Sequence, residues 1–112
     1  MKLNLFLLVF FSFLLSNFSY AQKIFKGQYE SQADIKVYST GYESQCDLKV
    51  YVVNYESQAS DDGKWYFVKY ESQADFRVFF VDYESQADLK IFFVDYESQA
   101  GWRNKQKSYL LK

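Results

Sequence analysis

The chain has 112 residues, of which 49% are hydrophobic, and it carries 13 basic and 14 acidic side chains. It contains no histidine and a single cysteine, which excludes a histidine-based catalytic triad, histidine metal ligands and an intrachain disulfide. The near balance of charge argues against a nucleic-acid-binding surface, and the length suits one small domain.

Residues 1–21 have the features of a secretory signal peptide. Lys2 gives a positive start, residues 6–15 form an apolar stretch interrupted by Ser12, and Ser19-Tyr20-Ala21 places small residues at a cleavage site. An uncleaved membrane anchor is the alternative, but the apolar stretch is too short to span a bilayer comfortably. We therefore predict cleavage after Ala21, export (periplasmic or secreted) without stable membrane insertion, and a mature domain of residues 22–112.

The mature chain is built from a short repeat. The tetrapeptide Tyr-Glu-Ser-Gln occurs six times at a regular spacing, with one longer interval between Tyr55 and Tyr70, and a small residue follows each copy. Self-similarity at a fixed short period is typical of a repeat architecture. The copies begin at Tyr29, Tyr42, Tyr55, Tyr70, Tyr83 and Tyr96, and the small residues are Ala33, Cys46, Ala59, Ala74, Ala87 and Ala100.

The segments between the tetrapeptides are prone to form strands. Leu48 and Val50 fall on one face and Lys49 and Tyr51 on the other, and this period of two predicts a strand. Several segments are apolar on both faces, as in strands that are covered on both sides. Basic residues recur at one position, where we expect the outer face to meet water: Lys36, Lys49, Arg77 and Lys90. The predicted strands are 24–26, 35–39, 48–53, 64–68, 76–81 and 89–94, and the pattern allows another at 108–111.

The single longer interval divides the mature chain into two halves. Ser60-Asp61-Asp62-Gly63 is a turn signal in the middle of the repeats. The units on its two sides match at one constant offset, and each half has a leading strand and three tetrapeptide units. We therefore predict an all-β single domain of tandem 13-residue strand–loop units in two pseudo-symmetric halves. The predicted relation is a pseudo-two-fold between residues 23–63 and 64–105.

The connections between the predicted strands leave two topologies open. They contain about seven residues, whereas a tight hairpin needs two to five and a standard parallel crossover a dozen or more. A closed barrel-like sheet and a β-solenoid both fit such connections. The small residue after each glutamine fits either topology as a point of close approach, with Cys46 buried in place of alanine.

Two tandem units carry a resemblance to a known family. They are Tyr-Glu-Ser-Gln-Ala-Asp-Phe-Arg-Val-Phe-Phe-Val-Asp at 70–82 and Tyr-Glu-Ser-Gln-Ala-Asp-Leu-Lys-Ile-Phe-Phe-Val-Asp at 83–95. With the ending Gly101-Trp102-Arg103-Asn104, they resemble the septoil-knot family, bacterial proteins of unknown function. The resemblance covers nearly the whole mature chain, and the regular unit is broken at 39–41 and 60–63.

The resemblance implies a compact β-rich domain whose backbone forms a seven-crossing torus knot, and it brings no known active site. Knots are essentially absent from most folds, so composition alone does not suggest one. Two matching blocks of equal length suit a chain that goes around a common centre twice. We expect such threading to slow unfolding without any disulfide.

The repeated carboxylates are the first candidate site. If the loops lie on one rim, the six glutamates and the unit aspartates would form an acidic ring of the kind of oxygen ligands that Ca²⁺ prefers. The glycine-rich pattern of calcium-binding β-rolls is absent, however. We expect instead that the carboxylates cap turns and pair with basic residues on neighbouring strands, and we predict no metal site. The residues are Glu30, Glu43, Glu56, Glu71, Glu84 and Glu97 with Asp34, Asp47, Asp75 and Asp88.

The repeated aromatic residues are the second candidate site. The six motif tyrosines, with Trp65 and Trp102, would offer stacking surfaces to a carbohydrate or a peptide if they were exposed. We expect instead that each motif tyrosine packs between layers, with its hydroxyl group bonded to a loop. The motif serines have no histidine or lysine base at a fixed spacing and Cys46 has no histidine partner, so we predict no catalytic residue and no cofactor.

The leading functional hypothesis is an exported, non-enzymatic structural or binding module with an unknown partner. A calcium-dependent envelope or adhesion component would bring three or more carboxylate oxygens to one point. A carboxylate-based hydrolase would bring two carboxylates together and raise the pKa of one. Homo-oligomers remain open through strand edges near Ile24 or Tyr109. We expect the basic C-terminal tail to be solvated and frayed, with a docking arm for an acidic surface as the alternative; its residues are Arg103, Lys105, Lys107 and Lys112.

Overall fold

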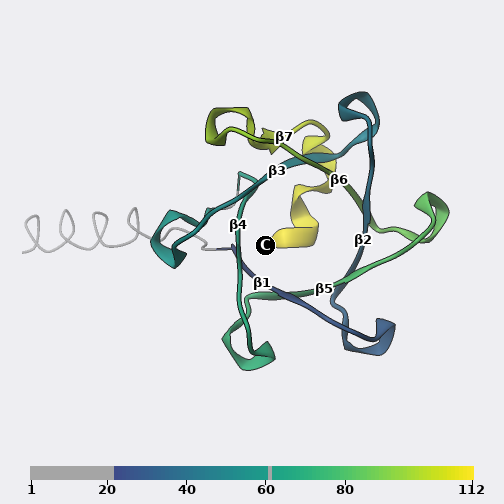
Figure 1. The fold of residues 1–112 in the computed structure, drawn as a ribbon. Helices are drawn as coiled ribbons and strands as arrows, with labels where there is room; N and C mark the ends of the chain where they lie inside the picture. Colours follow the sequence, from purple (N-terminus) through teal and green to yellow (C-terminus); the bar gives the residue numbers. More distant parts are fainter. Residues whose placement is uncertain (1–21, 61) are drawn as a thin grey trace, which may run out of the picture.

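The computed structural model describes residues 22–60 and 62–112. The predicted signal peptide, residues 1–21, and Asp61 lie outside the described residues. The strands are β1 Gln22–Lys26, β2 Ile35–Ser39, β3 Leu48–Val52, β4 Lys64–Phe67, β5 Phe76–Phe80, β6 Leu89–Phe93 and β7 Gly101–Trp102 (Figure 1). The 3₁₀-helices are η1 Glu30–Gln32, η2 Glu43–Gln45, η3 Glu56–Gln58, η4 Glu71–Gln73, η5 Glu84–Gln86, η6 Glu97–Gln99 and η7 Lys105–Leu111.

The first six strands form a closed parallel barrel. Their order is β4-β1-β5-β2-β6-β3, and a further pairing between β3 and β4 closes the ring. All pairs among these six strands are parallel, whereas the short β7 lies antiparallel beside β3. The closed sheet confirms one of the two topologies that the connection length allowed and excludes the β-solenoid.

The order of the strands reveals the path of the backbone. Around the closed ring β4-β1-β5-β2-β6-β3, each strand of a half lies two positions beyond the strand that precedes it in the chain, and β4 lies directly beside β3, where the second half begins. The chain therefore goes around the ring twice, and the second circuit fills the gaps that the first leaves. This is the path of a seven-crossing torus knot.

Short connections suffice for this path. Residues 27–34 connect β1 to β2 across β5, and 40–47 connect β2 to β3 across β6. Eight extended residues reach about 26–29 Å, while a lateral step of about 10 Å past one strand and a return of about 17 Å along a five-residue strand require only about 20 Å. The usual crossover length does not apply, because each connection is an outward loop with one short 3₁₀ turn (Figure 1), and no α-helix has to cover the sheet.

The two halves are equivalent, as predicted, but their relation is not a two-fold. The strands that match in sequence are β1 with β4, β2 with β5 and β3 with β6. Matching strands are neighbours in the barrel, so one strand position, not half a turn, separates the halves. The halves interleave because the second circuit enters the gaps of the first.

The barrel interior is the hydrophobic core. Successive side chains of a strand point to opposite faces, and the strands alternate accordingly between buried and half-buried residues. One layer takes a fully buried residue from each of the six strands: Ile24, Val37, Val50, Trp65, Val78 and Ile91.

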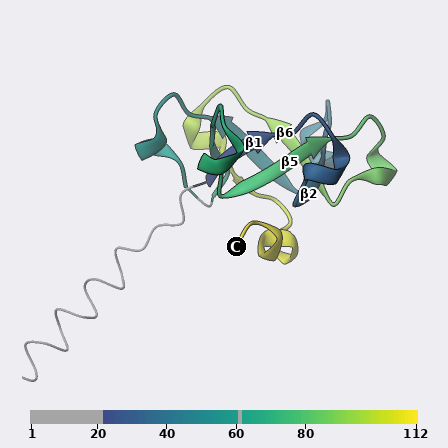
Figure 2. The same cartoon turned by 90° about the horizontal axis from the view of Figure 1, so that it is seen from below.

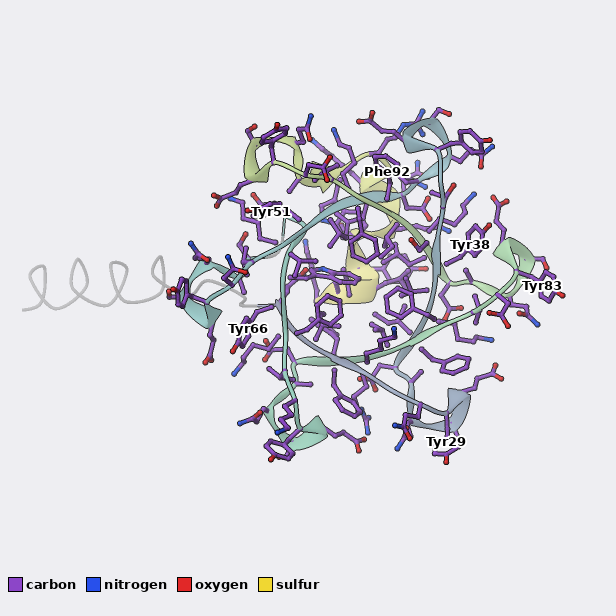
Figure 3. The ribbon with its side chains drawn as sticks, in the orientation of Figure 1. Tyr29, Tyr38, Tyr51, Tyr66, Tyr83 and Phe92 are labelled. Carbon is purple, nitrogen blue, oxygen red and sulfur yellow. The ribbon has the colours of Figure 1, made fainter. Side chains whose placement is uncertain are left out.

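The outer face of the barrel is half-buried, which corrects the expectation that both faces of the strands are covered. Each strand presents one basic residue followed by one aromatic residue on this face, and the stems of the basic side chains lie along the sheet. Figure 3 shows Tyr38 and Tyr66 outside the ring of strands. The pairs are Lys23 and Phe25, Lys36 and Tyr38, Lys49 and Tyr51, Lys64 and Tyr66, Arg77 and Phe79, and Lys90 and Phe92.

The C-terminal segment closes one end of the barrel, where η7 lies beneath the strands (Figure 2). Leu111 is buried against the core, and the buried amide of Gln22 accepts a hydrogen bond from Trp65 Nε1 at 2.8 Å and donates to the carbonyl oxygen of Leu111 at 3.4 Å. Asn104 begins the helix, and its side chain accepts a hydrogen bond from the backbone of Gln106. The suggested strand at 108–111 and the frayed tail were therefore wrong.

The remaining strand predictions agree closely with the structure. The strand at 35–39 has the predicted bounds, β1 begins at Gln22 instead of Ile24, and the strands starting at 48, 64, 76 and 89 end one residue earlier than predicted. β7 was missed because a pair of residues containing glycine carries no strand signal. None of the helices in the described part of the chain is long and apolar enough to cross a membrane.

Candidate functional site

Each Tyr-Glu-Ser-Gln copy folds into the same 3₁₀ turn at the outer end of a loop. The backbone N–H of the glutamine donates to the tyrosine carbonyl, and the N–H of the following small residue donates to the glutamate carbonyl, at 3.0–3.2 Å in all six copies. Figure 1 shows the six loops projecting outward from the ring of strands. We call the six turns together the tyrosine rim.

Ion pairs hold every turn against the outer face of the barrel. Each motif glutamate pairs with one of the outward basic residues at 3.0–3.6 Å. Four pairs join a turn to the strand that follows it, and two join a turn to a strand distant in sequence. The pairs are Glu30–Lys36, Glu43–Lys49, Glu71–Arg77, Glu84–Lys90, Glu56–Lys23 and Glu97–Lys64.

The unit aspartates connect the loops to the neighbouring strand. Asp34 donates its backbone N–H to the carbonyl of Arg77 at 2.8 Å, and its carboxylate accepts the backbone N–H of Arg77 at 2.9 Å. The same two bonds recur between three further aspartates and basic residues on the adjacent strand: Asp47 with Lys90, Asp75 with Lys23 and Asp88 with Lys36. The predicted pairing of the carboxylates with basic positions is confirmed.

The motif tyrosines are exposed, which corrects the expectation that they pack between layers. The six side chains are 59–68% exposed, and Figure 3 shows Tyr29 and Tyr83 at the outer ends of their loops. The alternation of buried and exposed residues ends before the tyrosine, and a turn with a charged residue follows the tyrosine. The aromatic side chain therefore stays outside the barrel. Polar flanking residues, as in Asp82-Tyr83-Glu84, were the signal that could have indicated this exposure.

The two tryptophans do not join the rim. Trp65 is fully buried in the core, and Trp102 is half-buried on β7. The motif serines are exposed in all six copies, beside the tyrosines. The rim therefore presents aromatic rings and serine hydroxyl groups, beside glutamates that stay 42–65% exposed and whose charge is offset by a basic residue.

The acidic residues do not gather into one ring. The motif glutamates lie on six separate turns, and within residues 22–60 and 62–112 there is no group of three histidine, cysteine or acidic residues that could hold a metal ion.

One pair of carboxylates does converge, around Arg77. Its guanidinium donates to Asp34 at 2.8 Å and to Glu71 at 3.0 Å, beside a groove of about 590 Å³ that Asp75 also lines. The hydrogen bonds from Arg77 lower the pKa of Asp34. A carboxylic general acid needs a raised pKa, so this site has the opposite shift from the one that the hydrolase hypothesis predicts.

Cys46 is buried, as predicted, in the place of the small unit residue. Burial raises the pKa of its thiol. The two edges suggested for self-association are not edges in this fold. β1, which contains Ile24, pairs with a strand on each side, and Tyr109 lies in η7. In the C-terminal tail, Lys107 binds the carboxylate of Asp47 at 3.3 Å.

Comparison with known proteins places the chain in a family. The model of the 7(1) septoil knot domain matches residues 21–103. No curated protein and no solved structure matches the chain. The matched residues cover most of the chain, and the double circuit of its strands is the topology that the family name describes. The chain belongs to the septoil knot domain family.

Proposed function

We propose that the chain is an exported, non-enzymatic binding module whose tyrosine rim stacks on the sugar rings of an extracellular or envelope polysaccharide. The observation that carries the proposal is the equal exposure, 59–68%, of all six motif tyrosines. An exposed aromatic ring offers an apolar face, and the tyrosine hydroxyl adds a polar end.

The chemistry of the rim favours a ligand surface that is rich in hydroxyl groups. Each motif glutamate is already paired with a basic residue. The glutamates stay exposed, but the basic partner offsets their charge, and the serine and glutamine beside each tyrosine donate and accept hydrogen bonds without charge. A sugar presents C–H groups on its ring face and hydroxyl groups at its edge. The C–H groups complement the tyrosine ring, and the hydroxyl groups complement the polar side chains beside it.

The pattern of variation among the units also supports a role for the loops. The residue that opens each regular strand changes between units, although its place in the barrel is equivalent, while the exposed tetrapeptide is identical in six copies. Packing constrains buried positions most, so packing does not explain why the exposed tetrapeptide varies less than the residue that opens the strand. The variable residues are Ile35, Leu48, Phe76 and Leu89.

The geometry suits binding at several points at once. Each turn is fixed by two backbone hydrogen bonds and one ion pair, so little freedom is lost when a ligand binds. Six weak contacts on one rigid frame raise the total affinity for a repeating polymer by avidity. A long polysaccharide offers such repeated contacts, whereas a single sugar does not.

Binding of polysaccharides by tyrosine variants tests the proposal. We expect replacement of one motif tyrosine by alanine to weaken retention on an insoluble polysaccharide a few-fold, and replacement of three to weaken it about 100-fold, because avidity multiplies the loss. The corresponding Tyr→Phe variants keep the ring and should bind within a few-fold of the parent protein. Co-sedimentation against a panel of neutral and acidic polysaccharides gives the affinities.

Tyr109→Ala is the matched control, because Tyr109 is 68% exposed but lies in η7 and not on the rim. Circular dichroism and the urea midpoint establish that every variant is folded. The proposal is overturned if no polysaccharide is retained by the parent protein, or if Tyr109→Ala weakens binding as much as a rim variant.

A further inference from the structure

A groove of about 520 Å³ lies between the first loop and the end of β4. β1 and β4, the neighbouring strands that open the two halves of the chain, both contribute to it. Its lining combines aromatic, amide and basic side chains: Phe25, Lys26, Gln28, Gln32, Phe67, Val68 and Lys69.

Among residues 22–60 and 62–112, neither lysine of the groove has a carboxylate partner. The outward basic residues of all six barrel strands have carboxylates within 4.0 Å, and Lys107 has Asp47. Within the described chain, no such ion pair includes Lys26 or Lys69. Both lie near aromatic rings instead, Lys26 Nζ at 5.1 Å from the centroid of Phe80 and Lys69 Nζ at 5.7 Å from that of Tyr70.

Both lysines also depart from the repeat. The last residue of the other five barrel strands is serine, valine or phenylalanine, and Lys26 is the basic exception. The residue before each motif tyrosine is elsewhere Gln28, Gly41, Asn54, Asp82 or Asp95, and Lys69 is the basic exception. Two independent departures thus place two unpaired positive charges in one groove.

We propose that this groove is an anion-binding subsite of the tyrosine rim, which holds the carboxylate or sulfate group of an acidic polysaccharide at Lys26 and Lys69. This inference rests on the proposed function and names the class of polysaccharide. Tyr70, whose ring Lys69 approaches, stacks on the sugar that carries the charge. Phe25 and Phe67 give the groove an apolar wall, and the amide groups of Gln28 and Gln32 meet sugar hydroxyl groups.

Affinity electrophoresis with three probes tests the subsite: polygalacturonate for carboxylates, dextran sulfate for sulfates and dextran as a neutral polymer. We expect the K26Q/K69Q double variant to lose about tenfold in affinity for an acidic probe at low salt, and less at high salt, because the lost contacts are between charges. Its affinity for the neutral probe should stay within about twofold. The acidic probe with the larger loss identifies the natural charge group.

Lys105→Gln is the matched control for net charge, because Lys105 is an exposed lysine of η7 outside the groove. The subsite is overturned if the double variant binds both acidic probes as the parent protein does, or if Lys105→Gln loses as much. Retention of neutral polysaccharides by the parent protein without preference for acidic ones overturns the subsite alone. Acidic binding that needs the lysines but survives the triple tyrosine variant overturns the rim and keeps the groove.

Discussion

The unit aspartate shows how one side chain can fix the register of a parallel barrel. Parallel strands have no hairpin to set their alignment, and a slip of one residue would move the buried set outward. Asp34 prevents this slip with two hydrogen bonds to the backbone of Arg77, one through its own N–H and one through its carboxylate. Such a bond is stronger when the accepting carboxylate is ionised, because charge-assisted hydrogen bonds are about twice as strong as neutral ones.

The stability of the protein should therefore depend on pH through Asp34. The hydrogen bonds from Arg77 lower the pKa of Asp34 below its ordinary value in the folded state. A group with a lowered folded pKa contributes stability above its unfolded pKa, and this contribution disappears as the pH falls through the folded value. We expect Asp34→Asn to lower the melting temperature by about 2 °C at pH 7, a small effect because the pair is partly exposed. The difference from the parent protein should shrink below about pH 4.

Melting curves from pH 7 to pH 2.5 measure this difference. Asp88→Asn is the matched control, since Asp88 makes the same two backbone bonds but faces Lys36, which has no planar guanidinium to bind both carboxylate oxygens. We expect it to lose less at pH 7. A loss for Asp34→Asn that is the same at pH 2.5 and at pH 7 would contradict the assignment.

At the scale of elements, the inserted turn between the two halves leaves no room for a side chain at Gly63. Gly63 has a φ of +96°, and a Cβ atom placed on it would lie 2.3 Å from the carbonyl oxygen of Lys49 and 3.2 Å from the backbone nitrogen of Gly101. Here β3, β4 and β7 meet, so the backbone can neither change its conformation nor move away. The extra residues of this unit provide the turn that lets β4 pair directly with β3.

Gly63→Ala should consequently be among the most damaging small substitutions in the chain. A left-handed conformation and a clash with backbone together should lower the free energy of unfolding by about 3 kcal/mol or more. Gly41→Ala is the control, because a Cβ atom on Gly41 has no neighbour within 4 Å, and it should change stability by about 0.5 kcal/mol or less. Urea unfolding gives the midpoint of each variant, and equal midpoints would contradict the role of Gly63.

The strands were predictable from sequence because their signal is local. Alternation of apolar and polar residues depends only on neighbours along the chain, and it gave Ile35–Ser39 with its observed bounds. The choice between a barrel and a solenoid was not local, since both bury the same faces. The strand that each unit aspartate binds is distant in the sequence, and nothing at Asp34 itself specifies which distant strand it binds.

The candidate site was predictable in composition but not in exposure. The repeat identified the tyrosines, and charge pairing identified the partners of the glutamates. A residue such as Tyr83 could either pack beneath its loop or project from it, and only the direction of the 3₁₀ turn decides this. The groove at Lys26 and Lys69 was invisible to sequence for another reason: β1 and β4 become neighbours only when the second circuit enters the first.

At the scale of the whole molecule, the interleaving of the two circuits contributes to the stability of the barrel, together with the side-chain contacts. Every strand pairing joins a strand of the first circuit, β1 to β3, to a strand of the second, β4 to β7. Long-range pairing of this kind makes folding slow. It also makes partial opening difficult, because a strand cannot leave its gap without separating two neighbours. This accounts for a small domain that stays folded without a disulfide.

Cys46 provides a direct measure of that opening. Its thiol is buried at the start of β3, where Asp47 binds Lys90 of β6 on one side and Asn104 and Lys107 of the C-terminal segment on the other. Burial also raises the pKa of the thiol, so the reactive thiolate is scarce at neutral pH. We therefore expect iodoacetamide to modify Cys46 only as fast as the barrel unfolds, with a half-life of hours to days at about 25 °C.

The control is a C46A/S44C variant, which moves the thiol to an exposed position of the same turn. It should react within minutes, at the rate of a free thiol. Mass spectrometry follows both reactions, and denaturant should accelerate the modification of Cys46 along the unfolding limb measured by circular dichroism. If Cys46 instead reacts at the rate of the control in the absence of denaturant, the first circuit opens without the second, and the interleaving of the two halves is not what slows unfolding.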